Sequence, residues 1–282
     1  LLPRQADFAL CYQGSWCYPD GLPYFQLWQH EIGYLANCAR LGQFYIERTG
    51  AKITFWRDPR TALPGFVDYF LNTILAIVLE LQGVLCLHAS SVTIGAHTIA
   101  FLGDSGAGKS SLAAEFLAAG ATLLADDITP VLPQPDAHGI VPMRPQLKLH
   151  PEVAKRALPA EIRKSLSIAA DKKYWIPVGQ NQCPWSPHVN RLSALYILEP
   201  HNDINPESAN ITSQRLSGHM SSFALMRHSY VAPLVSVLGL QQSWLNRLIN
   251  LASTLPIRRL GYDHGLHQLP HIQRTIMQTL EA

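Results

Sequence analysis

The sequence has little charge of either sign and almost no excess of one sign over the other. Only 15% of its 282 residues are charged, and 22 basic against 20 acidic side chains leave a formal net charge of +2. A chain without a strong positive field has no general attraction for nucleic acid or for an anionic membrane surface. We therefore expect neither nucleic acid nor a membrane among its partners.

Cysteine is scarce, and its five copies show neither a CxxC pair nor a spacing with histidine that is typical of a metal site. An odd, dispersed set of cysteines in a chain of this length indicates reduced thiols and a cytoplasmic location. A disulfide between Cys11 and Cys17 is the alternative. The pattern argues against a disulfide scaffold and against a cysteine-based zinc domain.

The sequence also lacks an uninterrupted apolar run long enough to cross a membrane, which takes about 18 to 20 residues. Polar residues interrupt the longest apolar stretch, residues 66–87, at Asp68, Asn72, Glu80 and Gln82. Gly83 then breaks the helical pattern, and the residues after it have strand character. We therefore expect a buried helix that ends near Gly83.

Two regions with different patterns divide the chain. Residues 1–60 are rich in aromatic residues and predict a small β-rich region, in which residues 43–58 fit two strands joined at Thr49-Gly50. Residues 61–282 predict an α/β domain. Within it, residues 84–94 and 97–103 fit a hairpin, residues 192–200 fit an apolar strand, and residues 221–239 and 243–255 fit helices.

The segment Gly103–Ser110, GDSGAGKS, fits the phosphate-binding pattern GxxxxGK[ST] in full. Glycines let the backbone wrap a polyphosphate with its N–H groups turned inward, and the helix that follows adds the positive end of its dipole. Lys109 is expected to reach the β- and γ-phosphates, and Ser110 to offer its hydroxyl to magnesium. In a chain of this length, a chance match to this pattern is expected on the order of one per cent of the time.

This segment also has the strand before it and the helix after it that the motif requires, so we predict a site for ATP and Mg²⁺. The predicted nucleotide-binding residues are Gly103, Ser105, Gly106, Ala107, Gly108, Lys109, Ser110 and Ser111.

Two adjacent acids, Asp126 and Asp127, end the apolar strand that follows this helix. Consecutive parallel strands of a right-handed β-α-β unit end at the same edge of a sheet, which places both acids near the phosphates. One carboxylate could hold magnesium while the other accepts a proton from an attacking hydroxyl. Both can face the site only if the chain turns at the strand end. The alternative is that one acid binds metal and the other caps the next loop.

The stretch Gly103–Asp127, with LHAS at residues 87–90, resembles the catalytic domain of HPr serine kinase/phosphorylase. It is more similar still to the HPr-kinase-like proteins found beside peptide-tailoring genes, which include the lasso-peptide precursor kinases. Weaker support comes from residues 145–153, 171–178, 192–200 and 225–235. The resemblance implies the compact P-loop kinase fold shared with phosphoenolpyruvate carboxykinase, preceded here by the small β-rich region.

The resemblance also implies roles for individual residues. It makes Asp126 the base and Asp127, with Ser110, the metal-side group, although the two acids could be exchanged. Lys109 would be catalytic as well as phosphate-binding. His88 matches a histidine of the family, and the alternative for it is an ordinary core histidine. Enzymes of this family are often oligomeric, which implies a homo-oligomer.

One segment departs from the pattern of typical HPr kinases, which carry a Glu-Ile-Arg-Gly-type signature after the acid pair. Residues 141–145 here read Val-Pro-Met-Arg-Pro. The difference argues against HPr itself as the substrate and against the reverse phosphorolysis.

Together these residues predict an ATP-dependent kinase that phosphorylates a hydroxyl of a peptide or protein, a serine near a chain terminus, as in a lasso-peptide precursor. One alternative is a small-molecule kinase that acts on a free amino acid. Another is a nucleotide-dependent regulatory protein, although the absence of an NKxD motif argues against a GTPase switch. Lys148, Lys173 and Arg227 could steady phosphate or substrate, or could be ordinary surface charges.

Overall fold

The computed structural model of the protein describes residues 7–157, 163, 166–168, 172–179, 184–201 and 211–281. The chain folds as two compact units, Leu1–Val84 with Val231–Leu245, and Leu85–Tyr230 with Asn246–Ala282. The first unit extends beyond residue 60, the boundary expected from the sequence. The physical reason is aromatic packing, because Phe44 of the N-terminal sheet stacks on Phe66 and Phe70, with ring centroids 5.0 and 5.9 Å apart.

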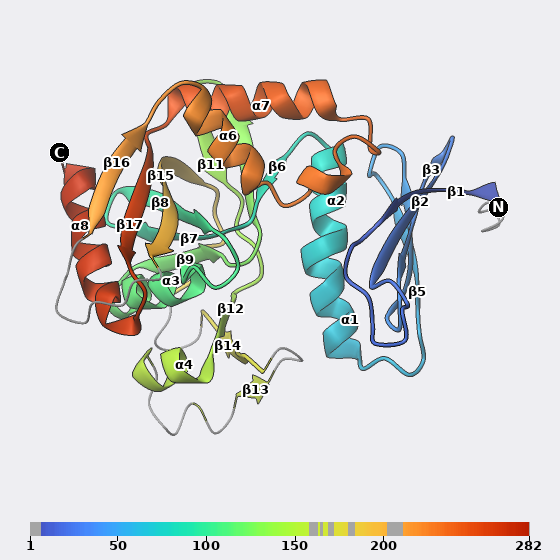
Figure 1. Cartoon of the computed structure of the whole chain (residues 1–282), viewed down its shortest axis with the longest axis horizontal. Helices are drawn as coiled ribbons and strands as arrows, with labels where there is room; N and C mark the ends of the chain where they lie inside the picture. The colour runs from blue at the N-terminus through green and yellow to red at the C-terminus, as the bar shows by residue number, and fades with distance from the viewer. Residues whose placement is uncertain are drawn as a thin grey trace. The chain divides into compact units, whose positions relative to one another are not determined.

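The first unit contains a five-stranded antiparallel sheet in the order β1-β2-β3-β4-β5 (Figure 1). Its strands are β1 (Ala9–Gln13), β2 (Phe25–His30), β3 (Gly33–Cys38), β4 (Gly42–Glu47) and β5 (Ile53–Arg57). The hairpin expected over residues 43–58 is confirmed, since β4 pairs with β5. Gly50 lies in the connecting turn with φ of 72°, a conformation that glycine adopts at little cost.

A helical stretch from Leu63 to Leu81 follows and consists of α1 (Leu63–Tyr69), the π-helical turn η2 (Phe70–Ile74) and α2 (Leu75–Leu81). It ends just before Gly83, as expected, and most of its buried residues lie in its second half, at Ile74, Ala76, Ile77, Val78 and Glu80. Among the described residues it is the one helix long and apolar enough to cross a membrane. Core helices of soluble proteins share that length and composition, so the helix alone is weak evidence for a span.

The second unit is built on a mixed sheet, which confirms the α/β class. Over the described residues the strand order is β6-β10-β11-β15-β8-β7-β9, with β17 paired to β15 and β16 paired to β17. The strands are β6 (Leu85–Leu87), β7 (Ala89–Ile94), β8 (His97–Gly103), β9 (Thr122–Ala125), β10 (Thr129–Gln134), β11 (Ala137–Ile140), β15 (Asn190–His201), β16 (Thr212–Leu216) and β17 (Ile257–Asp263).

The part of this sheet that positions the site is β8, the glycine-rich loop, helix α3 (Lys109–Ala118) and β9. Strand β7 lies between β8 and β9 and pairs antiparallel with both, so β8 and β9 run parallel and end at the same edge of the sheet. Helix α3 packs on the sheet through Phe116, whose ring centroid lies 5.3 Å from that of Phe101. Ile272 and Ile276 of helix α8 (Leu269–Glu281) belong to the same core.

The other described elements of the chain are short strands and helices. They are β12 (Gln146–Leu149), β13 (Ser167–Ile168) and β14 (Tyr174–Pro177), which form a separate sheet, α4 (Pro151–Ala157), α6 (His219–Arg227), η3 (Ala232–Leu234), α7 (Gln241–Thr254) and η4 (Leu266–Gln268). The helix expected over residues 221–239 was therefore wrong beyond Arg227. Pro233 has no backbone N–H to donate, and the chain there forms turns and the short 3₁₀ segment η3.

Candidate functional site

The loop between β8 and α3 wraps around a cavity of about 140 Å³. Gly103, Gly106 and Gly108 have φ values of 153°, 87° and 92°, in the region that favours glycine. A Cβ atom on Gly103 would lie 2.9 Å from the Cβ of Ala107 and from a backbone oxygen of β15, so no larger residue fits there. Helix α3 begins directly after Gly108, and its first N–H groups lack partners within the helix. The loop therefore has the shape and polarity of an anion cradle.

Two hydrogen-bonding side chains hold this loop in place. The buried Tyr262 of β17 donates its hydroxyl to the carbonyl oxygen of Ala107 at 2.6 Å, and burial raises the pKa of Tyr262, which keeps the donor neutral. Lys109 donates from Nζ to the carbonyl oxygens of Gly103 and Asp104 at 2.8 and 3.1 Å. The Lys109 side chain thus folds back on its own loop and lines the cavity.

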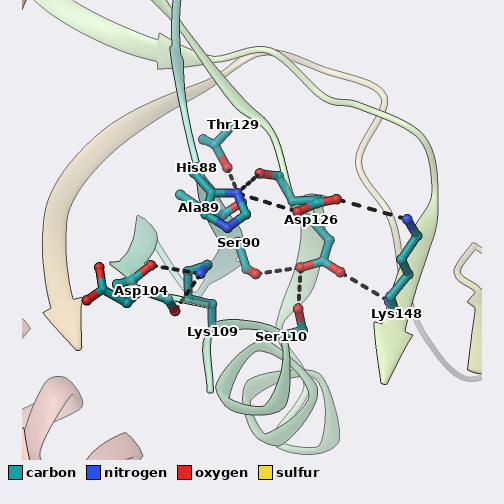
Figure 2. A network of polar contacts seen from close by, with 11 residues as sticks. His88, Ala89, Ser90, Asp104, Lys109, Ser110, Asp126, Thr129 and Lys148 are labelled. Atoms are coloured by element: carbon teal, nitrogen blue, oxygen red, sulfur yellow. Dashed lines mark hydrogen bonds and ion pairs between the residues drawn. The ribbon is translucent and has the colours of Figure 1, made fainter. Parts of the chain in front are cut away.

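Asp126 is half-buried and accepts three hydrogen bonds (Figure 2). Its Oδ1 atom accepts from the Oγ of Ser90 at 2.5 Å and from the Oγ of Ser110 at 2.9 Å, and its Oδ2 atom accepts from the backbone N–H of Lys148 at 3.1 Å. Burial raises the pKa of Asp126, and the hydrogen bond from Ser90 is the largest effect that opposes the rise. The first acid of the pair is therefore tied to the hydroxyl that the motif offers to magnesium.

Asp127 faces the cavity instead, because the chain turns at this residue. Its φ is 75°, a left-handed conformation that costs a residue other than glycine roughly 1–2 kcal/mol and that concentrates at functional sites. Asp127 Oδ1 lies 3.4 Å from Nδ1 of His88, and Asp127 Oδ2 lies 4.0 Å from Nζ of Lys148. The turn required for both acids to reach the site is thus present at the end of β9.

His88 lies between β6 and β7 and lines the same cavity. Its Nδ1 atom is 2.9 Å from the carbonyl oxygen of Asp127. A carbonyl oxygen only accepts, so this ring nitrogen carries the hydrogen and Nε2 is left as an acceptor. Burial lowers the pKa of His88, with a further contribution from Lys109. The ring is accordingly neutral near pH 7.

His228, in the segment after α6, is buried next to this site, and its backbone oxygen accepts the backbone N–H of His88 at 2.8 Å. Burial lowers the pKa of His228 from 6.5 to about 4. Below pH 6.5 the unfolded chain takes up a proton on this ring, whereas the folded protein does so only below about pH 4. The stability that His228 contributes as a neutral group is therefore complete above pH 6.5 and is lost as the pH falls toward 4.

We expect the free energy of unfolding to fall by about 3 kcal/mol more between pH 7 and pH 4 in the wild type than in His228→Gln, because the variant has no group to protonate there. Urea unfolding of both proteins at several pH values measures the difference. Parallel curves for the two proteins over this range would show that His228 is not held neutral by the fold.

The structure brings together most of the residues predicted from the sequence. Ser105, Gly106, Gly108, Lys109, Ser110, Ser111, Asp127 and His88 line the cavity, while Gly103 and Ala107 shape the loop behind it. Of the weaker candidates, Lys148 and Lys173 also line the cavity, and Arg227 contacts Asp104.

Sequence reasoning missed Ser90, His150 and His228. Ser90 had a usable signal, since residues two apart on a strand share a face and His88 was already a candidate. His150 follows β12, which belongs to a different sheet, and no local pattern connects it with the glycine-rich loop.

Metal binding at this site would use few protein ligands. The described residues contain no group of three or more His, Cys, Asp or Glu side chains that could hold a metal ion. Mg²⁺ in phosphate-transfer sites is held by one or two protein oxygens together with substrate phosphates and water. The hydroxyl of Ser110 and the carboxylate of Asp126 are oxygen ligands of the kind that Mg²⁺ prefers, so the residues present fit this ion.

Comparison with known proteins gives limited information. No family model matches the chain, and no curated protein matches it. Among solved structures, the chain is similar to the HPr(Ser) kinase/phosphatase from Coxiella burnetii, with 10% sequence identity, a TM-score of 0.37, and coverage of 70% of this chain and 99% of that one. A similarity this distant does not assign a function, so the chemistry of the site is assigned from the residues of this chain.

Proposed function

We infer that this protein is an ATP-dependent kinase that transfers phosphate to a hydroxyl group, in the manner of HPr-kinase-like P-loop enzymes. The observation that carries the inference is the position of the two acids around one cradle. Asp126 accepts a hydrogen bond from Ser110 at the start of α3, and Asp127 turns into the cavity that Lys109 also lines. A protein that only binds nucleotide would need Asp126, on the metal side. It would have no use for a second carboxylate, Asp127, in the cavity.

The cradle suits a polyphosphate because its glycines leave the backbone N–H groups accessible and because α3 begins there. When a nucleotide is bound, its phosphate oxygens would replace the carbonyl oxygens of Gly103 and Asp104 as acceptors for the ammonium group of Lys109. Mg²⁺ at Ser110 and Asp126 would neutralise charge between the phosphates. These residues thus bind and orient the donor nucleotide.

The resemblance implied that Asp126 is the base and Asp127 the metal-side group. The contacts favour the opposite assignment. Both carboxylate oxygens of Asp126 accept hydrogen bonds, from Ser90, Ser110 and the backbone of Lys148, which suits a group that orients a metal ligand and not one that moves a proton. Asp127 is 35% exposed and faces the cavity. We assign Asp126 to the metal side and Asp127 to the base that accepts the hydroxyl proton.

Two neighbours hold Asp127 for that task. His88 donates Nδ1–H to the backbone oxygen of Asp127 and fixes the turn, while the ammonium of Lys148 lies 4.0 Å from Oδ2 of Asp127 on the other side. His88 is therefore a positioning residue in this proposal, and its neutral ring adds no competing positive charge beside Lys109.

The acceptor is proposed to be a serine near the end of a flexible peptide, as in a lasso-peptide precursor. A peptide hydroxyl beside Asp127 would lie in the cavity that His150 and Lys173 also line. Residues 141–145 lack the signature of enzymes that act on HPr. A cytoplasmic location is consistent with the free thiols of Cys11, Cys17, Cys38 and Cys86; Cys183 lies outside the described residues.

The test incubates the protein and ATP–Mg²⁺ with a serine-ended peptide, with HPr or with free serine, and measures gain of phosphate by mass spectrometry. We expect phosphate on the peptide and none on HPr. Phosphorylation of free serine without activity on any peptide would replace this acceptor with a small molecule. ATP consumption without transfer to any acceptor would favour a regulatory nucleotide switch.

A further inference from the structure

Arg227, the last residue of α6, forms an ion pair with the second residue of the cradle loop. Its Nη2 atom lies 2.5 Å from Oδ2 of Asp104, although 123 positions separate the two residues in the sequence. The backbone oxygen of Asp104 accepts a hydrogen bond from Lys109 at 3.1 Å, and Figure 2 shows this contact. Two cationic side chains therefore contact Asp104: Lys109 bonds to its carbonyl oxygen and Arg227 to its carboxylate.

The backbone beside Arg227 is fixed to the chain that carries His88. The carbonyl oxygen of His228 accepts the N–H of His88 at 2.8 Å, and the N–H of Tyr230 donates to the oxygen of Cys86 at 2.9 Å. This attachment keeps the end of α6 next to the cradle. The side chain itself has room to move, because 65% of the Arg227 side chain and 63% of the Asp104 side chain are exposed.

Two cationic side chains lie at this end of the site, because Lys109 and Arg227 both contact Asp104 of the loop. An exposed ion pair such as that of Arg227 with Asp104 contributes little stability. An arginine exchanges such a partner readily for a phosphate, with which it forms two parallel charge-assisted hydrogen bonds.

We propose that Arg227 is a second phosphate-binding cation of the cradle, held by Asp104 in the absence of nucleotide and released to the terminal phosphate of a bound nucleoside triphosphate. The inference rests on the proposed function. A guanidinium placed in this way would stabilise the negative charge that develops during phosphoryl transfer, and arginines in that role raise turnover by roughly 10³–10⁵-fold in other P-loop enzymes. Because the contact is to the terminal phosphate, it would favour a triphosphate over a diphosphate.

The experiment compares the affinities of ADP and of a non-hydrolysable ATP analogue, each with Mg²⁺, by calorimetric titration. In Arg227→Ala we expect about tenfold weaker binding of the analogue with ADP affinity unchanged, since one charge-assisted contact to a phosphate is lost. Turnover with a peptide acceptor should fall by about 10³-fold. Arg227→Lys should recover part of the affinity for the analogue. Arg156→Ala, which removes an arginine paired with Glu115 of α3 at 3.5 Å, is the matched control and should change neither affinity.

Equal weakening of both nucleotides in Arg227→Ala, or no change in either, would overturn the inference and leave a structural ion pair. If Arg227→Ala does not fold, Arg227→Gln keeps the aliphatic part of the side chain and a polar end without the charge, and gives the same comparison. Failure of the proposed function has a different signature, because the wild type would then transfer phosphate to no acceptor, whereas the comparison of the ATP analogue with ADP in Arg227→Ala does not depend on transfer.

Discussion

Replacement of Lys109 by alanine is expected to abolish phosphoryl transfer, with a loss of at least about 10³-fold, and to weaken ATP–Mg²⁺ binding strongly. The ammonium group of Lys109 donates to the carbonyl oxygens of Gly103 and Asp104, at 2.8 and 3.1 Å. Phosphate oxygens are better acceptors for an ammonium group than carbonyl oxygens are, because the hydrogen bond joins two ions. The lysine therefore contributes most when nucleotide is bound.

Calorimetric titration with ATP–Mg²⁺ and a transfer assay test this prediction. Lys109 is 8% exposed, so Lys109→Met, which fills most of the same volume, separates the loss of charge from a packing defect. Lys155→Ala on the exposed side of α4 is the matched control, and circular dichroism checks the fold of each variant. Unchanged ATP affinity together with unchanged turnover in Lys109→Ala would remove the phosphate role of this residue.

The second large effect is expected from substitutions in the acid pair, and the two substitutions should affect different properties of the enzyme. Asp127→Asn is expected to lower turnover by about 10²–10⁴-fold while ATP affinity is retained, because an amide cannot accept the hydroxyl proton. Asp126→Asn should instead raise the Mg²⁺ concentration needed for half-maximal activity, because its carboxylate is the group bonded to Ser110. Asp126→Asn should also cost stability, since an amide replaces a carboxylate that accepts three hydrogen bonds.

Turnover measured over a range of Mg²⁺ concentrations separates the two roles. Asp136→Asn, in the exposed turn between β10 and β11, is a neutral control for the loss of one carboxylate. If Asp127→Asn shifts the Mg²⁺ dependence and Asp126→Asn lowers only turnover, the roles are those implied by the resemblance and the assignment made from the contacts is wrong.

The features of the site that are local in sequence were predictable. The pattern of Gly103–Ser110 defines the conformation of its loop, because positive φ values at glycine and the start of a helix after Gly108 are properties of a few consecutive residues. The same holds for the common edge of β8 and β9, which follows from the handedness of the β-α-β connection even with β7 paired between them.

The direction of each acid was not predictable, because it depends on the backbone conformation of one residue. A positive φ at Asp127 sends its side chain into the cavity and leaves Asp126 with Ser110. Nothing in the dipeptide distinguishes this outcome from the reverse, since aspartate is tolerated in the left-handed region at either position.

Contacts between segments that are distant in the sequence could not be predicted from it either. Lys148 meets Asp126 across 22 positions and Arg227 meets Asp104 across 123, and no periodicity links such pairs. The boundary of the first unit has a similar origin, since residues 231–245 join it from far along the chain. Packing of whole elements decides these pairings, and single-sequence patterns describe only the elements themselves.

The central claim is that ATP and Mg²⁺ bind in the cradle formed by the loop after β8 and the start of α3. Hydrogen–deuterium exchange measured with and without ATP–Mg²⁺ tests it most directly, because backbone N–H groups that bind phosphate exchange more slowly. We predict protection of residues 103–111, with the protection lost in Lys109→Ala. ATP binding that protects another part of the chain and leaves residues 103–111 unchanged would contradict the claim.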